Sequence, residues 1–225
     1  MLVPYLKKIP LFKHLKDAQL REIASRCKTV TCRRGTILFR RTDMSTDFYI
    51  VHSGRMKALL EDDEGDEIVL AQFEKGDFFG ELSLLDGKGR SATIVADEDA
   101  ELSVLNKGVF YDLLMKDPKM AVGLMITLVE RLRRADEMIE SLAFREVGER
   151  LIRILLEDAG TATGEDPRYL RTAKLTHREL AARIGSSRES VSKCMKTLVA
   201  KKIVREGSGC LLVARGALEQ LKAGE

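Results

Sequence analysis

The first third of the chain consists of short apolar runs separated by turn residues. An amphipathic segment over residues 12–24 precedes them and predicts a short helix. The runs that follow are Gly35–Phe39, Phe48–Gly54, Met56–Leu60, Glu67–Leu70 and Ser91–Ala96. Many short strands at this spacing are typical of a sandwich, jelly roll or barrel. The acidic segment 61–67 lacks the residue order of a calcium loop, so we interpret it as a solvated hairpin turn.

After Pro118 the apolar period changes from that of strands to that of a long helix. Apolar residues recur at alternating spacings of four and three, flanked by charged residues, at Ala121, Met125, Leu128, Leu132, Ala135, Ile139 and Leu142. A helix with this narrow stripe either packs on its own domain or pairs with a second helix. The strict 3.5-residue period favours a two-stranded coiled coil and therefore a homodimer.

The last third predicts helices as far as Lys202, interrupted by a loop at 160–167, and then a hairpin over 203–213 that turns at 207–209. Two capping boxes, at 176–179 and 186–189, open two short amphipathic segments joined through Gly185. With the small Ala181 where the segments approach, this pattern predicts a helix-turn-helix, and the hairpin then forms the wing of a winged variant. Val191 and Leu198 are expected to face inward.

The outward positions at the start of the second helix are those that meet base edges when a recognition helix enters the major groove. The predicted DNA-binding residues are Thr176, Ser187, Arg188, Glu189, Ser192, Lys193 and Lys196. Capping boxes and amphipathic helix pairs also occur in many helical domains that bind no DNA, and Glu189 can serve only as a cap. Charge decides between these interpretations.

The net charge of +3 hides a strong asymmetry. Between Arg168 and Arg205 there are eleven Lys or Arg residues and two acids, so this segment carries +9 and the remainder carries −6. One basic segment on an otherwise acidic protein points to a polyanionic partner. Together with the helix pattern, it predicts binding to double-stranded DNA.

Composition excludes several other classes of protein. The 225 residues are 44% hydrophobic and 32% charged, as in a folded domain rather than a disordered one. We expect a cytoplasmic protein with no membrane partner, because no apolar stretch approaches the ~18 residues of a span and no export signal is evident. Four cysteines without a C-x-x-C pair and three scattered histidines predict neither a disulfide framework nor a metal site. No nucleophile–base pair appears, so we do not expect an enzyme.

The segment 79–93 has the residues of a phosphate-binding site. A turn with free N–H groups at Gly80 and Leu82 can hold a phosphate, and Arg90 can neutralise it with two parallel hydrogen bonds. Ser91 adds a hydroxyl donor, and the ionised Glu81 is an acceptor suited to a ribose 2′-hydroxyl. The same residues can also form a glycine-rich surface loop with a Glu81–Arg90 ion pair.

This segment resembles the phosphate-binding cassette of cyclic-nucleotide-binding domains, and the whole chain is similar to the CRP/FNR regulators. The resemblance implies an α+β protein: an eight-stranded jelly-roll domain at 1–117, a dimerisation helix at 118–145, and a winged helix-turn-helix at 146–225. It also implies binding at palindromic promoters and contact with RNA polymerase. The cysteine cluster of oxygen-sensing FNR proteins is absent.

By this resemblance, Glu81 holds the ribose of a cyclic nucleotide, and Arg90 and Ser91 hold its phosphate. Gly80, Leu82 and Ala92 supply backbone contacts. Cyclic-AMP-responsive members carry two hydroxyl residues on the central helix, where this chain has Ala135 and Asp136. Asp136 can accept from the amino group of adenine or from the paired N–H donors of guanine. Thr42 stands where many members have a glycine turn, so that loop is expected to differ.

These features predict a dimeric transcription regulator switched by a cyclic nucleotide, with cyclic AMP favoured over cyclic GMP. Cyclic-AMP-responsive relatives use an Arg-Glu pair to read TGTGA-like half-sites, and FNR-like relatives read TTGAT. Arg188 and Glu189 favour an inverted TGTGA-like repeat here. The alternatives are the same fold with a different effector or none, and a cyclic-nucleotide-binding regulatory subunit that binds no DNA.

Overall fold

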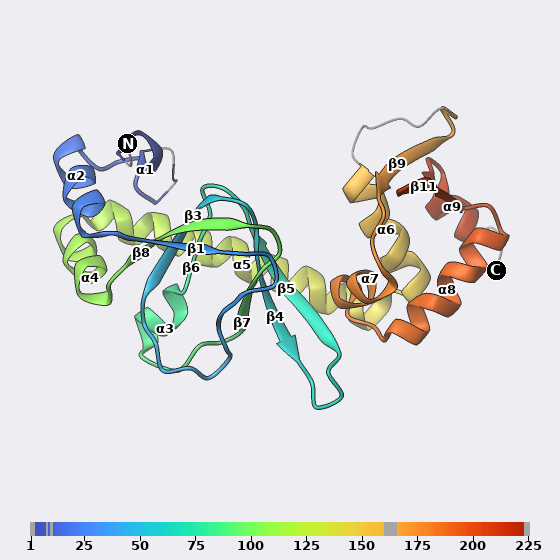
Figure 1. The fold of residues 1–225 in the computed structure, drawn as a ribbon, viewed down its shortest axis with the longest axis horizontal. Coiled ribbons are helices and arrows are strands. Elements are labelled where there is room, and N and C mark those ends of the chain that lie inside the picture. Colours follow the sequence, from blue (N-terminus) through green and yellow to red (C-terminus); the bar gives the residue numbers. More distant parts are fainter. Residues whose placement is uncertain (1–2, 8, 10, 160–165, 223–225) are drawn as a thin grey trace. The chain divides into compact units, whose positions relative to one another are not determined.

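The computed structural model describes residues 3–7, 9, 11–159 and 166–222. The chain divides into two compact units: residues 1–60 together with 70–134, and residues 61–69 together with 135–225. Figure 1 gives the order of the elements, which are described below unit by unit.

The N-terminal lead-in contains two helices, α1 (Val3–Leu6) and α2 (Asp17–Arg26). The helix predicted at 12–24 therefore begins later than expected. The side chain of Gln19 accepts a hydrogen bond of 2.9 Å from the backbone N–H of Lys16, which fixes the helix start there. Phe12 and Leu15 precede α2 in turns and are buried, so their apolar character serves the core rather than a helix stripe.

Two four-stranded antiparallel sheets form the body of the first unit. In sheet order, the first is β1 (Lys28–Cys32), β8 (Ala100–Leu105), β3 (Phe48–Ser53) and β6 (Phe78–Phe79). The second is β2 (Ile37–Phe39), β7 (Thr93–Ala96), β4 (Met56–Glu61) and β5 (Glu67–Phe73). The sequence predicted β2, β3, β4, β5 and β7 but missed the other three. β1 is mostly polar, and it exists because it pairs with β8 along its whole length.

Strand β3 is buried on both faces and separates two apolar cores. Phe48 and Ile50 contribute to the core beneath the helices, and Tyr49 and Val51 contribute to the core between the sheets. Alternate residues of a strand point to opposite faces, so one strand supplies both cores. In β6, Phe78 packs into the core beneath the helices and Phe79 into the core between the sheets. This packing anchors the start of the predicted cassette.

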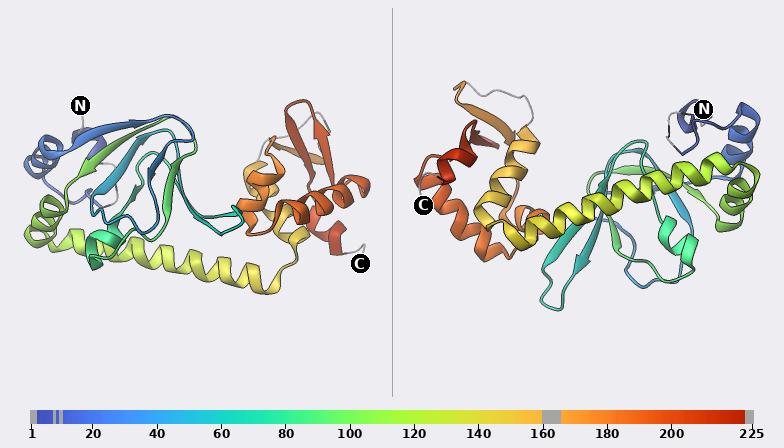
Figure 2. Two further views of the ribbon diagram at one scale, coloured as in Figure 1. Left: turned by 60° about the horizontal axis from the view of Figure 1, so that its bottom comes forward. Right: turned by 180° about the vertical axis from the view of Figure 1, so that it is seen from behind.

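Helix α4 (Lys107–Lys116) and the part of α5 (Pro118–Phe144) up to Arg134 complete this unit, and the first part of α5 runs along the sandwich (Figure 2). Met120 and Leu124 of α5 are buried in the helix-covered core, and Leu128 packs against it.

The exposed apolar residues in the first half of α5 differ from those of the predicted dimer seam. Leu128 turns toward its own domain, whereas Val122 and Val129 are each 50% exposed. The exposed large apolar residues of α5 are Val122, Met125, Ile126, Val129, Leu132, Ile139, Leu142 and Phe144. One stripe among them runs through Val122, Met125, Val129, Leu132 and Ile139. Their spacing is again that of a heptad, with Asp136 at the remaining position between Leu132 and Ile139. One apolar stripe of α5, containing Met120, Leu124 and Leu128, packs against the first unit, and the neighbouring apolar stripe is exposed.

The second unit contains α6 (Val147–Ala159), α7 (His177–Ile184), α8 (Arg188–Ala200) and α9 (Ala217–Lys222) around a small sheet. The sheet order is β10 (Val204–Gly207), β11 (Cys210–Ala214) and β9 (Tyr169–Ala173). The predicted hairpin is confirmed as β10 and β11. The prediction of helix up to Lys202 was wrong at β9, whose five residues pair with β11. Most of the predicted loop, residues 160–165, lies outside the described residues.

Candidate effector and DNA-binding sites

The predicted cassette begins at a turn that only glycine fits. Gly80 joins β6 to the short helix α3 (Glu81–Asp86) with a φ of 90°. A Cβ at Gly80 would lie 2.6 Å from the carbonyl oxygen of Asp47 and 2.8 Å from Nη1 of Arg90. A side chain here is excluded by both the backbone conformation and the lack of space. The turn places the N–H of Leu82 in the first turn of α3, where N–H groups have no acceptor within the helix.

Arg90 is a buried cation held only by neutral acceptors. It is 3% exposed, and its guanidinium donates to Ser45 Oγ at 2.8 Å, to the Gly80 carbonyl at 3.2 Å and to the Asp47 carbonyl at 3.0 Å. The ring of Phe39 lies 4.1 Å from the guanidinium carbon. Burial lowers the pKa of Arg90. None of the ion pairs found among the described residues includes Arg90, although the negative charges of Asp47 and Glu81 act on it and oppose the effect of burial on its pKa.

Glu81 pairs with Arg131, an arginine that the sequence analysis did not single out. Arg131 of α5 donates one hydrogen bond to Glu81 Oε1 and another to the carbonyl of Phe78, both at 2.5 Å. Glu81 is 1% exposed, and its second oxygen, Oε2, is buried with no hydrogen-bond partner. A buried acceptor without a donor is costly, and a sugar hydroxyl is a donor of the required kind. The predicted Glu81–Arg90 surface ion pair is not the arrangement observed.

The remaining predicted ligand residues differ in exposure. Ser91 is exposed, Leu82 is 45% exposed, and Ala92 packs into the core between the sheets. Ala135 and Asp136 are exposed on α5 and belong to the second unit. Their contact with a nucleotide stays a prediction, as do the ligand roles of the other three.

Thr42 keeps the conformation of a glycine turn although it is β-branched. Its φ is 75°, and its N–H donates to the carbonyl of Arg90 at 2.9 Å. The Arg90 N–H donates in turn to the Asp43 carbonyl at 3.0 Å. A Cβ at Gly89 would lie 2.9 Å from the Thr42 carbonyl oxygen. Tight pairing with the cassette holds Thr42 in a conformation that is unfavourable for its residue type. The expected difference from the loop of other family members stays a prediction.

The helix-turn-helix forms as the sequence predicts, with one change at its second cap. Thr176 caps α7, and Glu179 closes the capping box with a hydrogen bond of 2.7 Å from the Thr176 N–H. The second helix is capped by Ser187, whose side chain accepts from the Ser190 N–H at 3.2 Å. The predicted capping box between Ser186 and Glu189 was therefore wrong by one residue. Glu189 is the second residue of α8 and is exposed.

The turn between the two helices is held by a residue that the sequence analysis missed. Gly185 has a φ of 61° and ends α7. Arg150 of α6 donates from Nη1 to the carbonyls of Ile184 and Gly185. A cation at a helix C-terminus is favourable because the last carbonyls carry partial negative charge. The sequence offered one signal for this role, which is that Arg150 lies within a strongly amphipathic helical segment.

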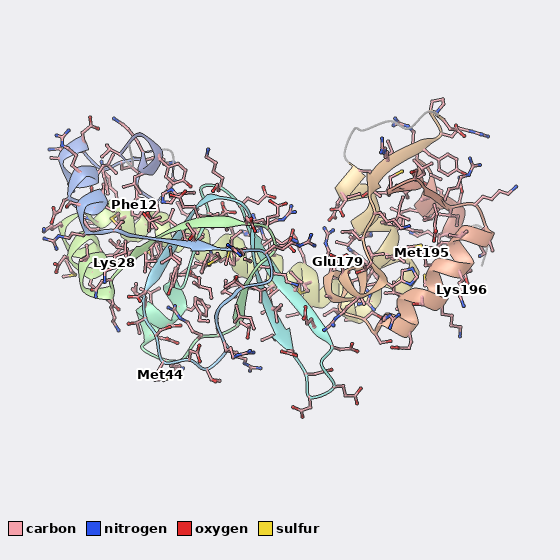
Figure 3. All side chains as sticks on the ribbon, in the orientation of Figure 1. Phe12, Lys28, Met44, Glu179, Met195 and Lys196 are labelled. Carbon is pink, nitrogen blue, oxygen red and sulfur yellow. The ribbon has the colours of Figure 1, made fainter. Side chains whose placement is uncertain are left out.

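The recognition helix α8 separates its apolar and polar faces as predicted. Val191, Met195 and Leu198 are buried, whereas Arg188, Glu189, Lys193 and Lys196 are exposed. Figure 3 labels Met195 and Lys196, adjacent residues on the two faces of this helix. Ser192 is half-buried, and its hydroxyl donates to the carbonyl of Arg188 at 2.8 Å.

Other kinds of site were sought in the described part of the chain. It contains no group of three His, Cys, Asp or Glu residues placed to hold a metal ion. All four cysteines are free thiols. In the described helices, none has the length and apolar character needed to cross a membrane.

Two family models match the chain. The cyclic nucleotide-binding domain matches residues 29–117, and the Crp-like helix-turn-helix domain matches residues 149–221. The Cyclic AMP receptor protein of Thermus thermophilus is 34% identical over 213 residues, covering 95% of this chain and 96% of that protein. The cAMP-activated global transcriptional regulator Vfr of Pseudomonas aeruginosa is 31% identical over 196 residues, covering 84% and 88%.

Solved structures share the fold. The Catabolite Activator Protein of Thermus thermophilus has a TM-score of 0.54 at 32% identity, covering 95% of this chain and 97% of that one. The c-di-GMP responsive regulator CLP of Xanthomonas campestris has a TM-score of 0.78 at 23% identity, covering 88% and 99%. The second match supports the architecture only.

A cyclic-nucleotide-binding sandwich followed by a long helix and a winged helix-turn-helix defines a DNA-binding transcription regulator with a small-molecule domain. The chain belongs to the CRP/FNR family of such regulators. The family is not one of enzymes, as the sequence predicted.

Proposed function

We propose that a cyclic nucleotide, with cyclic AMP favoured over cyclic GMP, switches this regulator between states of different DNA affinity. The proposal rests on two buried groups of the cassette: Arg90, which forms none of the ion pairs found among the described residues, and Glu81 Oε2, an acceptor that has no hydrogen-bond donor. A cyclic phosphate satisfies the first and a ribose hydroxyl satisfies the second. The named effector of the Thermus and Pseudomonas relatives is cyclic AMP.

Within this site, we propose that Ser91 joins Arg90 at the phosphate and that the N–H groups of Gly80, Leu82 and Ala92 complete the contacts. Asp136, beside Ala135, accepts from the base. Arg131 occupies one oxygen of Glu81 in this structure, so it links α5 to the proposed ribose site. The second oxygen is the one that remains for the ligand.

Isothermal titration calorimetry with cyclic AMP and cyclic GMP tests the effector directly. We expect binding of both, with cyclic AMP the tighter ligand. Binding of neither would support the alternative that the pocket takes another effector or none, since other members of the fold respond to different ligands, c-di-GMP among them.

We further propose that the regulator acts as a homodimer formed along the exposed stripe of α5. Met125 and Leu132 are 56% and 63% exposed, and large apolar side chains in a heptad pattern are stabilised by a partner helix. A two-fold dimer presents two copies of α8 to two half-sites about one or two helical turns apart. The proposed target is an inverted repeat of TGTGA-like half-sites, read by Arg188 on guanine and Glu189 on a cytosine amino group.

Selection from a random DNA pool tests the target, and a gel shift with and without cyclic AMP tests the switch. We expect paired TGA cores and a complex that strengthens with the nucleotide. A selected motif without paired TGA cores would contradict the assignment of Arg188 and Glu189. Contact with RNA polymerase and a cytoplasmic location follow from the proposed role as a promoter-binding regulator.

A further inference from the structure

The strongest feature that the proposed function does not use is a hydrogen bond between the two helices of the helix-turn-helix. His177 is the first residue of α7, and its Nδ1 lies 2.9 Å from the hydroxyl oxygen of Ser192 on α8. Both side chains are half-buried. The contact thus joins the start of the first helix to a position that the sequence assigned to base reading.

The partners of Ser192 determine which ring nitrogen of His177 carries the proton. The Ser192 hydroxyl donates its only hydrogen to the carbonyl of Arg188 at 2.8 Å, since a carbonyl can only accept. Its oxygen must therefore accept from His177, which requires a proton on Nδ1. In neutral His177 the other nitrogen, Nε2, is then an unprotonated acceptor. No hydrogen bond found among the described residues involves that nitrogen.

The position of His177 in the motif indicates which part of DNA it meets. In helix-turn-helix proteins the second helix enters the major groove, whereas the first crosses the sugar-phosphate backbone. His177 begins the first helix, one residue after the Thr176 cap. A neutral Nε2 offers a phosphate only a lone pair, whereas protonation turns it into a charged donor.

The charged groups around the ring favour coupling between protonation and DNA binding. The two helices carry Arg178, Glu179, Arg183, Arg188, Glu189, Lys193 and Lys196. Helix α6, which packs against both, adds Glu149, Arg150, Arg153, Glu157 and Asp158, and Glu67 pairs with Arg178 at 3.5 Å. Glu179 is engaged by the Thr176 cap, and none of the ion pairs found in the described part of the chain joins His177 to a carboxylate. Because none of these carboxylates pairs with His177, a DNA phosphate is the counter-charge that makes the second proton favourable.

We propose that His177, oriented by Ser192, is a phosphate-contacting residue whose protonation strengthens DNA binding as pH falls. Ser192 is then a positioning residue rather than a reader of bases. This inference rests on the proposed DNA-binding function of the same helices. The contact is to the backbone, so it is independent of operator sequence.

The test measures affinity and salt dependence of the full-length protein for a fluorescein-labelled duplex of about 30 base pairs and arbitrary sequence, with and without cyclic AMP. Anisotropy titrations over a range of KCl concentrations are run at about pH 6 and about pH 8, on either side of the ordinary titration range of histidine. Each protonated His177 that contacts a phosphate should steepen the slope of log K against log salt by about 0.9. At low salt the parent should bind about tenfold more tightly at the lower pH.

Four variants separate His177 from other groups. His177→Asn keeps a donor for Ser192 and removes Nε2, so its salt slopes should be equal at the two pH values, with near-parent affinity at about pH 8. Ser192→Ala should reduce the pH effect, and Ser192→Thr, which retains the hydroxyl, should restore it. His14→Asn, a change at an exposed histidine of the first unit, should leave the effect intact.

Equal salt slopes for the parent at both pH values, or a pH effect that persists in His177→Asn, would overturn the proposal. Failure of the parent to bind any duplex at either pH would instead contradict the DNA-binding function itself. Circular dichroism at both pH values checks that each variant remains folded.

Discussion

Replacing Arg90 by leucine tests the effector site most directly. An arginine side chain has five N–H donors. In this structure one donor on each nitrogen is used, on Ser45, Gly80 and Asp47. These bonds leave one further N–H on each terminal nitrogen, Nη1 and Nη2, beside the hydroxyl of Tyr49, and two such donors can bind two oxygens of one phosphate.

The expected loss follows from these two donors. Truncating one partner of a buried, hydrogen-bonded charge pair costs ~2–5 kcal/mol, which corresponds to an affinity for cyclic AMP lowered by a factor of about 30 to 5000. The substitution also removes the donors to the Gly80 and Asp47 carbonyls. Each unsatisfied acceptor costs ~1–3 kcal/mol, which a domain stable by ~5–15 kcal/mol tolerates in part. We therefore expect a folded but less stable first unit that does not bind the nucleotide.

Calorimetric titration with cyclic AMP measures the loss, and circular dichroism reports on the fold. Lys88→Leu is the matched control, because Lys88 is an exposed cation of the same segment; it should bind like the parent. Arg90→Lys keeps the charge without the two parallel donors and should be intermediate. If folded Arg90→Leu bound cyclic AMP within about threefold of the parent, the assignment of the phosphate to Arg90 would be refuted.

Four other substitutions test the remaining assignments. Leu132→Glu places like charges along the exposed seam and should give monomers with weakened operator binding. If light scattering still showed a dimer as stable as that of the parent, the interface would not lie along this stripe. Asp136→Ala should weaken ligand-induced DNA binding more than ligand binding, and equal losses in calorimetry and gel shifts would make it an ordinary pocket contact. Arg188→Ala should relax preference at one guanine by ~1–3 kcal/mol, and an unchanged selected motif would argue against direct reading. Thr42→Gly removes a left-handed penalty of ~1–2 kcal/mol and adds a glycine entropy cost of ~0.5–1 kcal/mol, so it should raise the melting temperature slightly. A melting temperature below that of the parent would show that Thr42 is unstrained.

Local patterns in the sequence were sufficient for those parts of the molecule whose structure depends on near neighbours. The caps of α7, the burial of Val191 and Leu198, and the hairpin of β10 and β11 follow from residues a few positions apart. The glycine turn at Gly80 and the charge asymmetry likewise needed no tertiary information.

Long-range contacts decided the rest. The polar strand β1 forms because β8 supplies its hydrogen-bond partners about seventy residues away. Periodicity alone could not show that Leu128 serves the core of its own domain while Val129 stays exposed, because two apolar stripes overlap on α5. The pairings of Arg131 with Glu81, of Arg150 with the α7 carbonyls and of His177 with Ser192 join residues that are distant or on different helices. A sequence pattern records which residues are polar, but only the packed chain determines which of them become each other's partners.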